Sequence, residues 1–226
     1  MTSLDWTTLK HLFKAHPWHG VSIGSDAPTR VNAYIEMVPT DSVKYEIDKV
    51  TGHLKLDRPQ RYSSRSPSLY GFLPQTFCGS RVGAYCESKT GRTGIHGDGD
   101  PLDICVLSER PVSHGDILVQ AIPIGGMRML DQDQSDDKIV AVLAGDLIYG
   151  GWTSIKNCPQ NVIERIRHYF LTYKDIPGAP DRKAEITHVF DADEAYEIIR
   201  LSREDYAEKF SEILEAQQRL SEEKAS

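Results

Sequence analysis

The sequence predicts an α+β fold in which a small closed β-barrel carries helices on its outside. Short apolar runs bounded by Gly, Pro and Asp dominate residues 33–143, which is typical of strands. Helical spacing of apolar residues begins only after residue 159. Strands first and helices afterwards are the pattern of an α+β domain. Because 226 residues suffice for one buried core, we expect a single domain over residues 1–226.

The strands are predicted from alternation and from turn residues. Residues 1–30 contain turn formers without a sustained period, so we expect an irregular N-terminal arm. Residues 33–38 alternate as a strand does, and residues 43–57, which turn at Thr51-Gly52, predict a hairpin. Three further strands are predicted at the apolar runs 104–107, 117–124 and 138–143.

Residues 77–97 predict a long surface loop. The segment contains Cys78, Cys86 and His96, but their spacing matches no zinc-binding pattern. All four cysteines are expected to be free thiols. His16 and His19, in the segment HPWHG, are interpreted as packing or turn residues instead of ligands.

Two helices are expected in the last third of the chain. Apolar residues recur at helical spacing from Val162 to Tyr173, with Pro159 near the first turn and Pro177-Gly178 as the stop. The second is a C-terminal helix over residues 191–226, which begins at an Asp191 cap with Glu194 three residues on.

The overall charge excludes some classes of function. A formal net charge of −7 argues against nucleic-acid binding, which needs a basic surface to displace counterions. No segment approaches the roughly 20 apolar residues that cross a bilayer, and the N-terminus lacks the apolar run of a secretory signal. We therefore expect a cytoplasmic protein that binds neither nucleic acid nor membrane.

The segment GDGDPLD, residues 97–103, is the strongest chemical signal. It places Asp98, Asp100 and Asp103 directly before an apolar strand. Two like charges about 4 Å apart repel by roughly 4 kcal/mol at an effective dielectric of 20, so the cluster favours cations. Oxygen ligands select magnesium, calcium or manganese. A solvated acidic turn is the alternative, whereas a calcium hand is contradicted by Leu102 and Asp103 at its fifth and glycine positions.

A second acidic loop and several basic residues complete the pattern. Residues 130–138 lie between two predicted strands and contribute Asp131, Asp133, Asp136, Asp137 and Lys138. Lys44 and Glu46 share one face of the hairpin and Arg58 ends its partner strand, while Tyr173-Lys174 ends the first helix. Cations that face a metal-filled acidic cup suit a small polyanion.

Taken together, these residues resemble the soluble family I inorganic pyrophosphatases. The family signature stands here as DGDPLD, and it is preceded by IEMVP, VKYEID, LDRP and LYGFLPQT and followed by the second acidic loop and HYFLTYKD. The resemblance covers residues 34–175. It implies a five-stranded, OB-like barrel with the active site at its mouth, hydrolysis of pyrophosphate to two phosphates, several Mg²⁺ ions per site with Mn²⁺ as a substitute, and a homo-oligomer.

The resemblance also implies a role for each matching residue. The metal ligands would be Asp98, Asp100, Asp103, Asp131 and Asp136, with Asp100 also taking the proton from the attacking water. Phosphate oxygens would be held by Lys44, Arg58, Lys138, Tyr173 and Lys174. Tyr70 would complete a phenolic wall. Besides Asp100, the catalytic residues would be Tyr70, Arg58 and Lys174. Glu36 and Glu46 would lie beside the phosphate-binding residues and orient water, the metal shells or the lysines.

The chain departs from the family at three places. Gln132 replaces an acidic residue of the second loop, Ser66 replaces an aromatic residue before Tyr70, and residues 77–97 are longer than in many bacterial members.

The rival functions are an OB-type nucleic-acid-binding module without catalysis, a structural calcium-binding protein and a general phosphoesterase.

Overall fold

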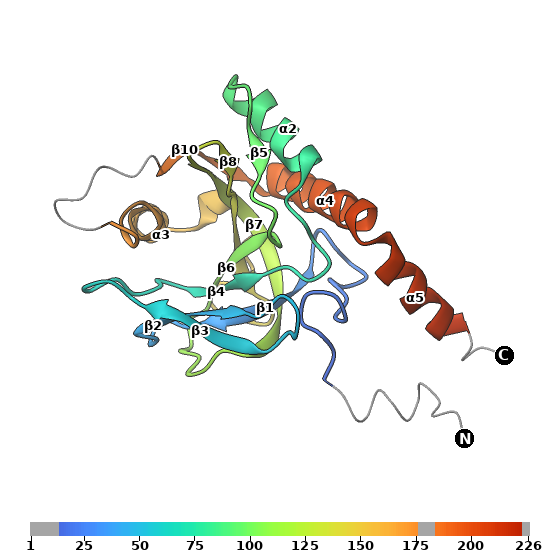
Figure 1. Cartoon of the computed structure of the whole chain (residues 1–226). Helices are drawn as coiled ribbons and strands as arrows, with labels where there is room; N and C mark the ends of the chain where they lie inside the picture. Colours follow the sequence, from blue (N-terminus) through green and yellow to red (C-terminus); the bar gives the residue numbers. More distant parts are fainter. Residues whose placement is uncertain (1–13, 176–183, 223–226) are drawn as a thin grey trace.

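Five strands form a ring in the computed structural model, which describes residues 14–175 and 184–222. Going round the ring, each strand is hydrogen-bonded to the next, and β1 also pairs with β7. The strands are β1 (Val31–Met37), β4 (Leu69–Phe72), β6 (Asp103–Leu107), β9 (Lys138–Leu143) and β7 (Ile117–Asp131). Figure 1 shows helices on both sides of these strands, which confirms the predicted α+β class.

The longest strand, β7, changes partner along its length. Residues 117–121 pair with β1, whereas residues 125–131 pair with β10 (Ala184–Asp191). Gly125 lies at the change, with φ 155° and a register shift against β9. A Cβ atom there would lie 2.3 Å from the carbonyl oxygen of Phe190, so only glycine fits. The strand therefore continues beyond the predicted residue 124 and ends at Asp131.

The predicted hairpin is confirmed. Strands β2 (Val43–Ile47) and β3 (Leu54–Pro59) form a separate two-stranded sheet in which Lys44 lies opposite Arg58. The Asp48 carboxylate accepts hydrogen bonds from the backbone N–H groups of Val50 and Thr51, at 3.2 and 2.9 Å. Gly52 closes the turn at φ 72°.

Two helices cover opposite faces of the strands. The predicted first helix is α3 (Gln160–Thr172), and it packs Ile163, Ile166 and Phe170 against Met127 and Val140. Helix α4 (Ala192–Lys209) packs Ala195, Ile198 and Ile199 in a different cluster, with Ile139 and Ala141. Adjacent residues of β9 thus point to different helices, as the period of two requires. None of the helices in the described ranges is long and apolar enough to span a membrane.

The expectation of a long surface loop at residues 77–97 is wrong. The segment contains helix α2 (Ser80–Thr90) and strand β5 (His96–Gly97), which pairs with β8 (Gln134–Ser135). Cys78 and Cys86 are buried free thiols, whereas His96 is exposed. The buried carboxylate of Asp205, on α4, accepts hydrogen bonds from the N–H groups of Gly79, Arg81 and Val82. Because this cap comes from far along the chain, no local capping signal marks the helix.

The first described segment of the chain packs against the C-terminal helices. In the irregular segment from residue 14 to 30, Trp18 is buried, donates a hydrogen bond to the Thr76 carbonyl oxygen at 2.8 Å and contacts Phe210 edge-on. His16 and His19 are packing residues, as predicted, since the His16 ring accepts the Trp18 N–H and His19 stacks on Trp18. The expected single C-terminal helix is two helices, α4 and α5 (Ser211–Glu222). The proposed stop at Pro177-Gly178 lies outside the described residues.

Candidate active site

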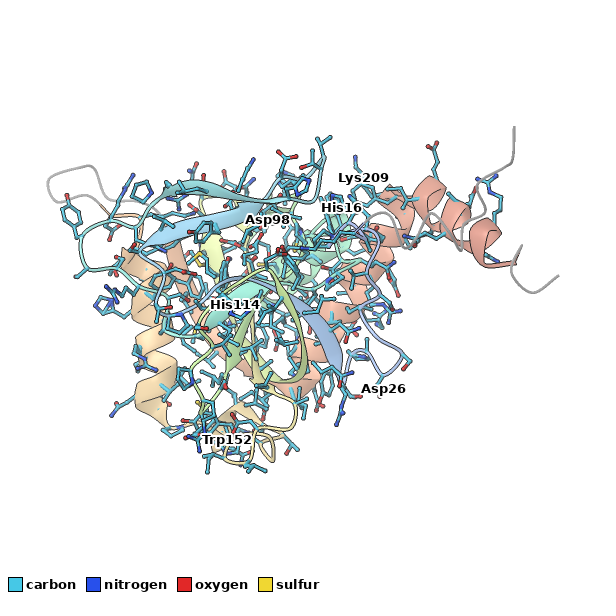
Figure 2. All side chains as sticks on the ribbon, turned by 90° about the horizontal axis from the view of Figure 1, so that it is seen from below. His16, Asp26, Asp98, His114, Trp152 and Lys209 are labelled. Carbon is cyan, nitrogen blue, oxygen red and sulfur yellow. The ribbon has the colours of Figure 1, made fainter. Side chains whose placement is uncertain are left out.

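Both acidic loops open into one pocket of about 230 Å³. Figure 2 labels Asp98 on its wall, well away from Trp152, which lines a different hollow. The pocket receives side chains from β1, the β2–β3 hairpin, β4, the two acidic loops and the end of α3. The predicted residues on its wall are Glu36, Lys44, Glu46, Tyr70, Asp98, Asp100, Asp103, Asp131, Asp136, Lys138, Tyr173 and Lys174.

The first acidic loop has a fixed backbone. The Asp98 carboxylate accepts the Asp100 N–H at 3.0 Å around Gly99, whose φ of 78° is left-handed. The Asp100 carbonyl oxygen accepts the N–H of Cys78 at 2.8 Å. Asp103 is the first residue of β6, so its position follows from the sheet. The loop therefore presents three carboxylates from a short, braced segment.

The second acidic loop is a tight hairpin. Asp131 ends β7 and pairs with Gln134 across the turn Gln132-Asp133, where Gln132 has φ 62°. Gln132 and Asp133 are exposed and lie outside the pocket wall, whereas Asp131 and Gln134 lie on it. Gln132, which stands where the resemblance leads one to expect an acidic residue, is therefore not part of the wall.

Lys138 joins the two loops. It is buried at the start of β9, directly opposite Asp103 of β6, and its ammonium group contacts both Asp103 and Asp136. Burial alone would lower the pKa of Lys138, but the two carboxylates outweigh it and raise this pKa well above its usual value. The loops therefore meet on one side of the molecule.

The other basic residues approach from the rim. Lys174 lies 3.1 Å from the Asp131 carboxylate, and Lys44 contacts Glu46. The Lys49 ammonium, in the turn after β2, contacts Asp100. Arg58 is absent from the pocket wall as described, because its guanidinium pairs with Asp57 and lies over the Tyr173 ring at 6.0 Å. Its expected phosphate contact thus requires a change of rotamer.

Two buried polar side chains shape the floor. The Tyr70 hydroxyl donates a hydrogen bond to Asp103 at 2.6 Å, and burial followed by the charge of Asp103 raises the pKa of Tyr70. Glu36 accepts the Ile47 N–H at 2.8 Å, which ties β1 to the hairpin. Burial raises the pKa of Glu36 to about 8, although the hydrogen bond from Ile47 opposes the shift.

The wall contains more acid than base. Seven carboxyl groups face four ammonium groups. The excess of carboxylates affects Asp98. Burial and then the charges of Asp136 and Asp103 raise the pKa of Asp98 well above its usual range. Within the described residues, no three metal-ligating side chains lie close enough together to hold a metal ion as they stand. The Lys138 ammonium lies between the carboxylates of Asp103 and Asp136. The donors are nonetheless all oxygens with surplus negative charge, and this set fits a hard divalent cation.

Sequence reasoning missed two polar wall residues, Lys49 and Gln134, and three apolar ones, Ile47, Phe72 and Pro101. Lys49 had a usable signal, since it follows Lys44 and Glu46 on the same hairpin. Ser66, which replaces an expected aromatic residue, is buried outside the wall and donates to the Ser68 carbonyl oxygen at 2.8 Å. Cys78 and Cys86 also lie outside the wall.

The known proteins that this chain resembles are inorganic pyrophosphatases. Residues 33–207 match the family model described as inorganic pyrophosphatase. An inorganic pyrophosphatase from Chlamydia trachomatis is 50% identical over 200 residues, which are 87% of this chain and 96% of that protein. Soluble inorganic pyrophosphatase 3 of Arabidopsis thaliana is 38% identical, over 86% of this chain and 80% of its own. The crystal structure of inorganic pyrophosphatase from Thermus thermophilus superposes with a TM-score of 0.70 at 29% identity, covering 84% of this chain and 98% of that one.

Proposed function

Because the chain belongs to the inorganic pyrophosphatase family and is a hydrolase of inorganic pyrophosphate, we propose that the pocket shared by the two acidic loops is where the diphosphate is split. The observation that supports this assignment most is Lys138, whose ammonium contacts one aspartate from each loop. A nucleic-acid-binding module is not favoured, given the acidic wall and the net charge of −7.

The family is metal-dependent, and we propose Mg²⁺ as the metal, with several ions per site and Mn²⁺ as a substitute. The proposed ligands are the five aspartates of the wall, Asp98, Asp100, Asp103, Asp131 and Asp136. Bound Mg²⁺ would supply positive charge to phosphoryl oxygens and would lower the pKa of a coordinated water below its bulk value of about 15.7. The surplus of carboxylates on the wall supports this assignment.

The protein's own residues then position groups and move one proton. We propose that Asp100 accepts the proton of the attacking water, because it lies on the wall and its carboxylate is partly exposed. Tyr70 holds the Asp103 carboxylate in one orientation through its hydroxyl. Glu36 and Glu46 support Lys44, since Glu46 contacts its ammonium and Glu36 ties β1 to its strand.

The phosphate oxygens are held by basic side chains and by Tyr173. Lys44, Lys138, Tyr173 and Lys174 lie on the wall, and Arg58 would join them on leaving Asp57. Charge on the leaving phosphate grows in the transition state, so cations placed there lower the barrier and not only the KM. Arg58 and Lys174 are proposed for this role.

The test is phosphate release from pyrophosphate with Mg²⁺ or with chelator, for the wild type, Asp100→Asn and Asp133→Asn. Removal of a general base typically costs a factor of about 10² to 10⁴ in turnover. We expect such a loss for Asp100→Asn at saturating Mg²⁺ and near-normal turnover for Asp133→Asn, whose exposed side chain lies outside the wall. Equal turnover in the two variants would reject the role of Asp100.

Four further expectations stay proposals. The ring of strands corresponds to the OB-like barrel, the chain forms a single domain, and copies of it assemble into a homo-oligomer in the cytoplasm. Light scattering on the purified protein would measure the assembly.

A further inference from the structure

A buried ion pair lies directly behind the second acidic loop. Arg128, on β7, has a fully buried side chain and binds the Asp137 carboxylate through Nε at 3.2 Å and Nη2 at 3.0 Å. Asp137 is equally buried and also accepts the backbone N–H of Met129 at 3.2 Å. Asp137 stands between Asp136 and Lys138 in the chain, and both of these neighbours line the pocket. The pair thus adjoins the site without being part of its wall.

The register of the strands explains this arrangement. Leu130 pairs with Ser135, and Met127 pairs with Lys138, in one continuous register that sets Arg128 opposite Asp137. Side chains alternate across a strand, so Asp136 and Lys138 point into the pocket when Asp137 points away from it. A slip of one residue would turn Asp137 into the pocket and Asp136 and Lys138 out of it.

Backbone ladders hold both ends of this segment, since Gln134 and Ser135 pair with β7 and β5, and Lys138 pairs with β6 and β7. Asp136 and Asp137, between these ladders, belong to neither strand. The ladder between β7 and β8 is only two residues long, and it ends in the exposed turn Gln132-Asp133. The sequence 131–138 offers acidic residues at several neighbouring positions. The buried Arg128 guanidinium requires a charged partner, and in the present register the partner from this segment is Asp137.

Arg128 is itself held from the side away from the pocket. Its Nη1 lies 3.1 Å from the Glu194 carboxylate in the first turn of α4. Its guanidinium carbon lies 5.2 Å from the ring of Tyr85, on α2, and 5.5 Å from the ring of Phe190, on β10. Three elements outside the pocket therefore fix the guanidinium, and through Asp137 they fix the loop.

We propose that the Arg128–Asp137 pair is a positioning device that, together with the strand ladders, holds the register of residues 131–138, and so the places of Asp131, Asp136 and Lys138 in the pocket. The inference rests on the proposed function only in treating these residues as ligands of metal and phosphate. Neither Arg128 nor Asp137 touches substrate in this scheme.

The experiment measures Mg²⁺ binding by calorimetry without substrate, together with turnover as a function of Mg²⁺ and the melting temperature in chelator. The variants are Arg128→Lys, which keeps the charge but loses the fork, Asp137→Asn, and the apolar double variant Arg128→Met with Asp137→Leu. Asp205→Asn is the matched control, because Asp205 is a buried carboxylate that pairs with Arg81 and does not line the pocket.

We expect each variant of the pair to weaken Mg²⁺ binding by about 10- to 100-fold, the usual effect of removing a residue that orients metal ligands. The double variant should regain much of the melting temperature lost in the single variants, because apolar side chains can replace a buried ion pair, but its Mg²⁺ affinity should stay low. Asp205→Asn should lower the melting temperature and leave Mg²⁺ affinity within about twofold.

Unchanged Mg²⁺ affinity in Arg128→Lys and Asp137→Asn, with only the melting temperature lowered as in the control, would overturn the proposal and leave the pair a structural contact. If the double variant does not fold, the Mg²⁺ affinity of Arg128→Lys decides whether the proposal stands. Failure of the proposed function looks different, since the wild type would then bind no Mg²⁺ or release no phosphate in its presence.

Discussion

Replacement of Lys138 by Met tests whether the acidic wall is unstable without cations. The Lys138 side chain is 3% exposed and its ammonium contacts Asp103 and Asp136, which are 21% and 15% exposed. Met keeps an unbranched chain of similar length next to the Phe170 ring. The change leaves two mostly buried carboxylates without their shared cation.

Removal of one partner from a buried pair costs about 3 to 5 kcal/mol. Because both carboxylates keep some contact with water, we expect about 3 kcal/mol in the presence of chelator. For a chain of this size that corresponds to a fall in Tm of roughly 6 to 12 °C. Saturating Mg²⁺ should restore at least half of the loss, since a divalent cation between the loops replaces the missing charge.

The assay is thermal unfolding at pH 7.5, in chelator and in Mg²⁺, with Lys156→Met as the control. Lys156 is 83% exposed and lies 3.3 Å from Asp191, so its loss should cost less than about 0.5 kcal/mol. A Tm deficit of Lys138→Met that is the same with and without Mg²⁺ would refute the idea that the two cations substitute for each other.

Three other outcomes follow from the same structure. In the wild type, Mg²⁺ at about 100 times its Kd should stabilise the fold by roughly 2.7 kcal/mol, and a thermal scan that shows no shift would contradict a metal-binding wall. Burial lowers the pKa of His19 from 6.5 to about 4, so the unfolded chain binds a proton at this imidazole more tightly than the folded chain does. The free energy of unfolding should therefore fall as the pH is lowered from 6.5 to 4, and His19→Phe should flatten this part of a profile of Tm against pH. Gly125→Ala should lower Tm strongly or prevent folding, because its Cβ would lie 2.3 Å from the Phe190 carbonyl oxygen; a soluble variant with unchanged Tm would show that β7 can move there.

Most of the fold could be predicted because alternation, helical spacing and turn residues are signals that lie within each element's own sequence. The hairpin is specified by alternation and by the turn at Gly52, and α3 by apolar residues at helical spacing. Helix α2 was missed because its cap is Asp205, which lies on α4. Its apolar residues Val82, Tyr85 and Cys86 do have helical spacing, but Gly and Ser around them obscure it.

The candidate site was predictable to the extent that its residues follow from short motifs. Asp98 and Asp103 were expected together, and both line the pocket. Arg58 was expected beside them, but its own neighbour Asp57 offers a closer partner, and only the structure shows this competition. Glu194 was interpreted as part of a helix cap, whereas its carboxylate pairs with Arg128.

The second acidic loop shows why charge alone does not define a site. Asp131, Asp133, Asp136 and Asp137 are equivalent by composition, yet Asp133 is exposed in the turn and Asp137 is turned towards Arg128. What separates Asp136 from Asp137 is the period of two along the chain, once a pairing with β7 has chosen the phase. The Arg128–Asp137 contact behind the pocket is proposed to reinforce that phase, so that residues which never meet a ligand help to select the acids that face it.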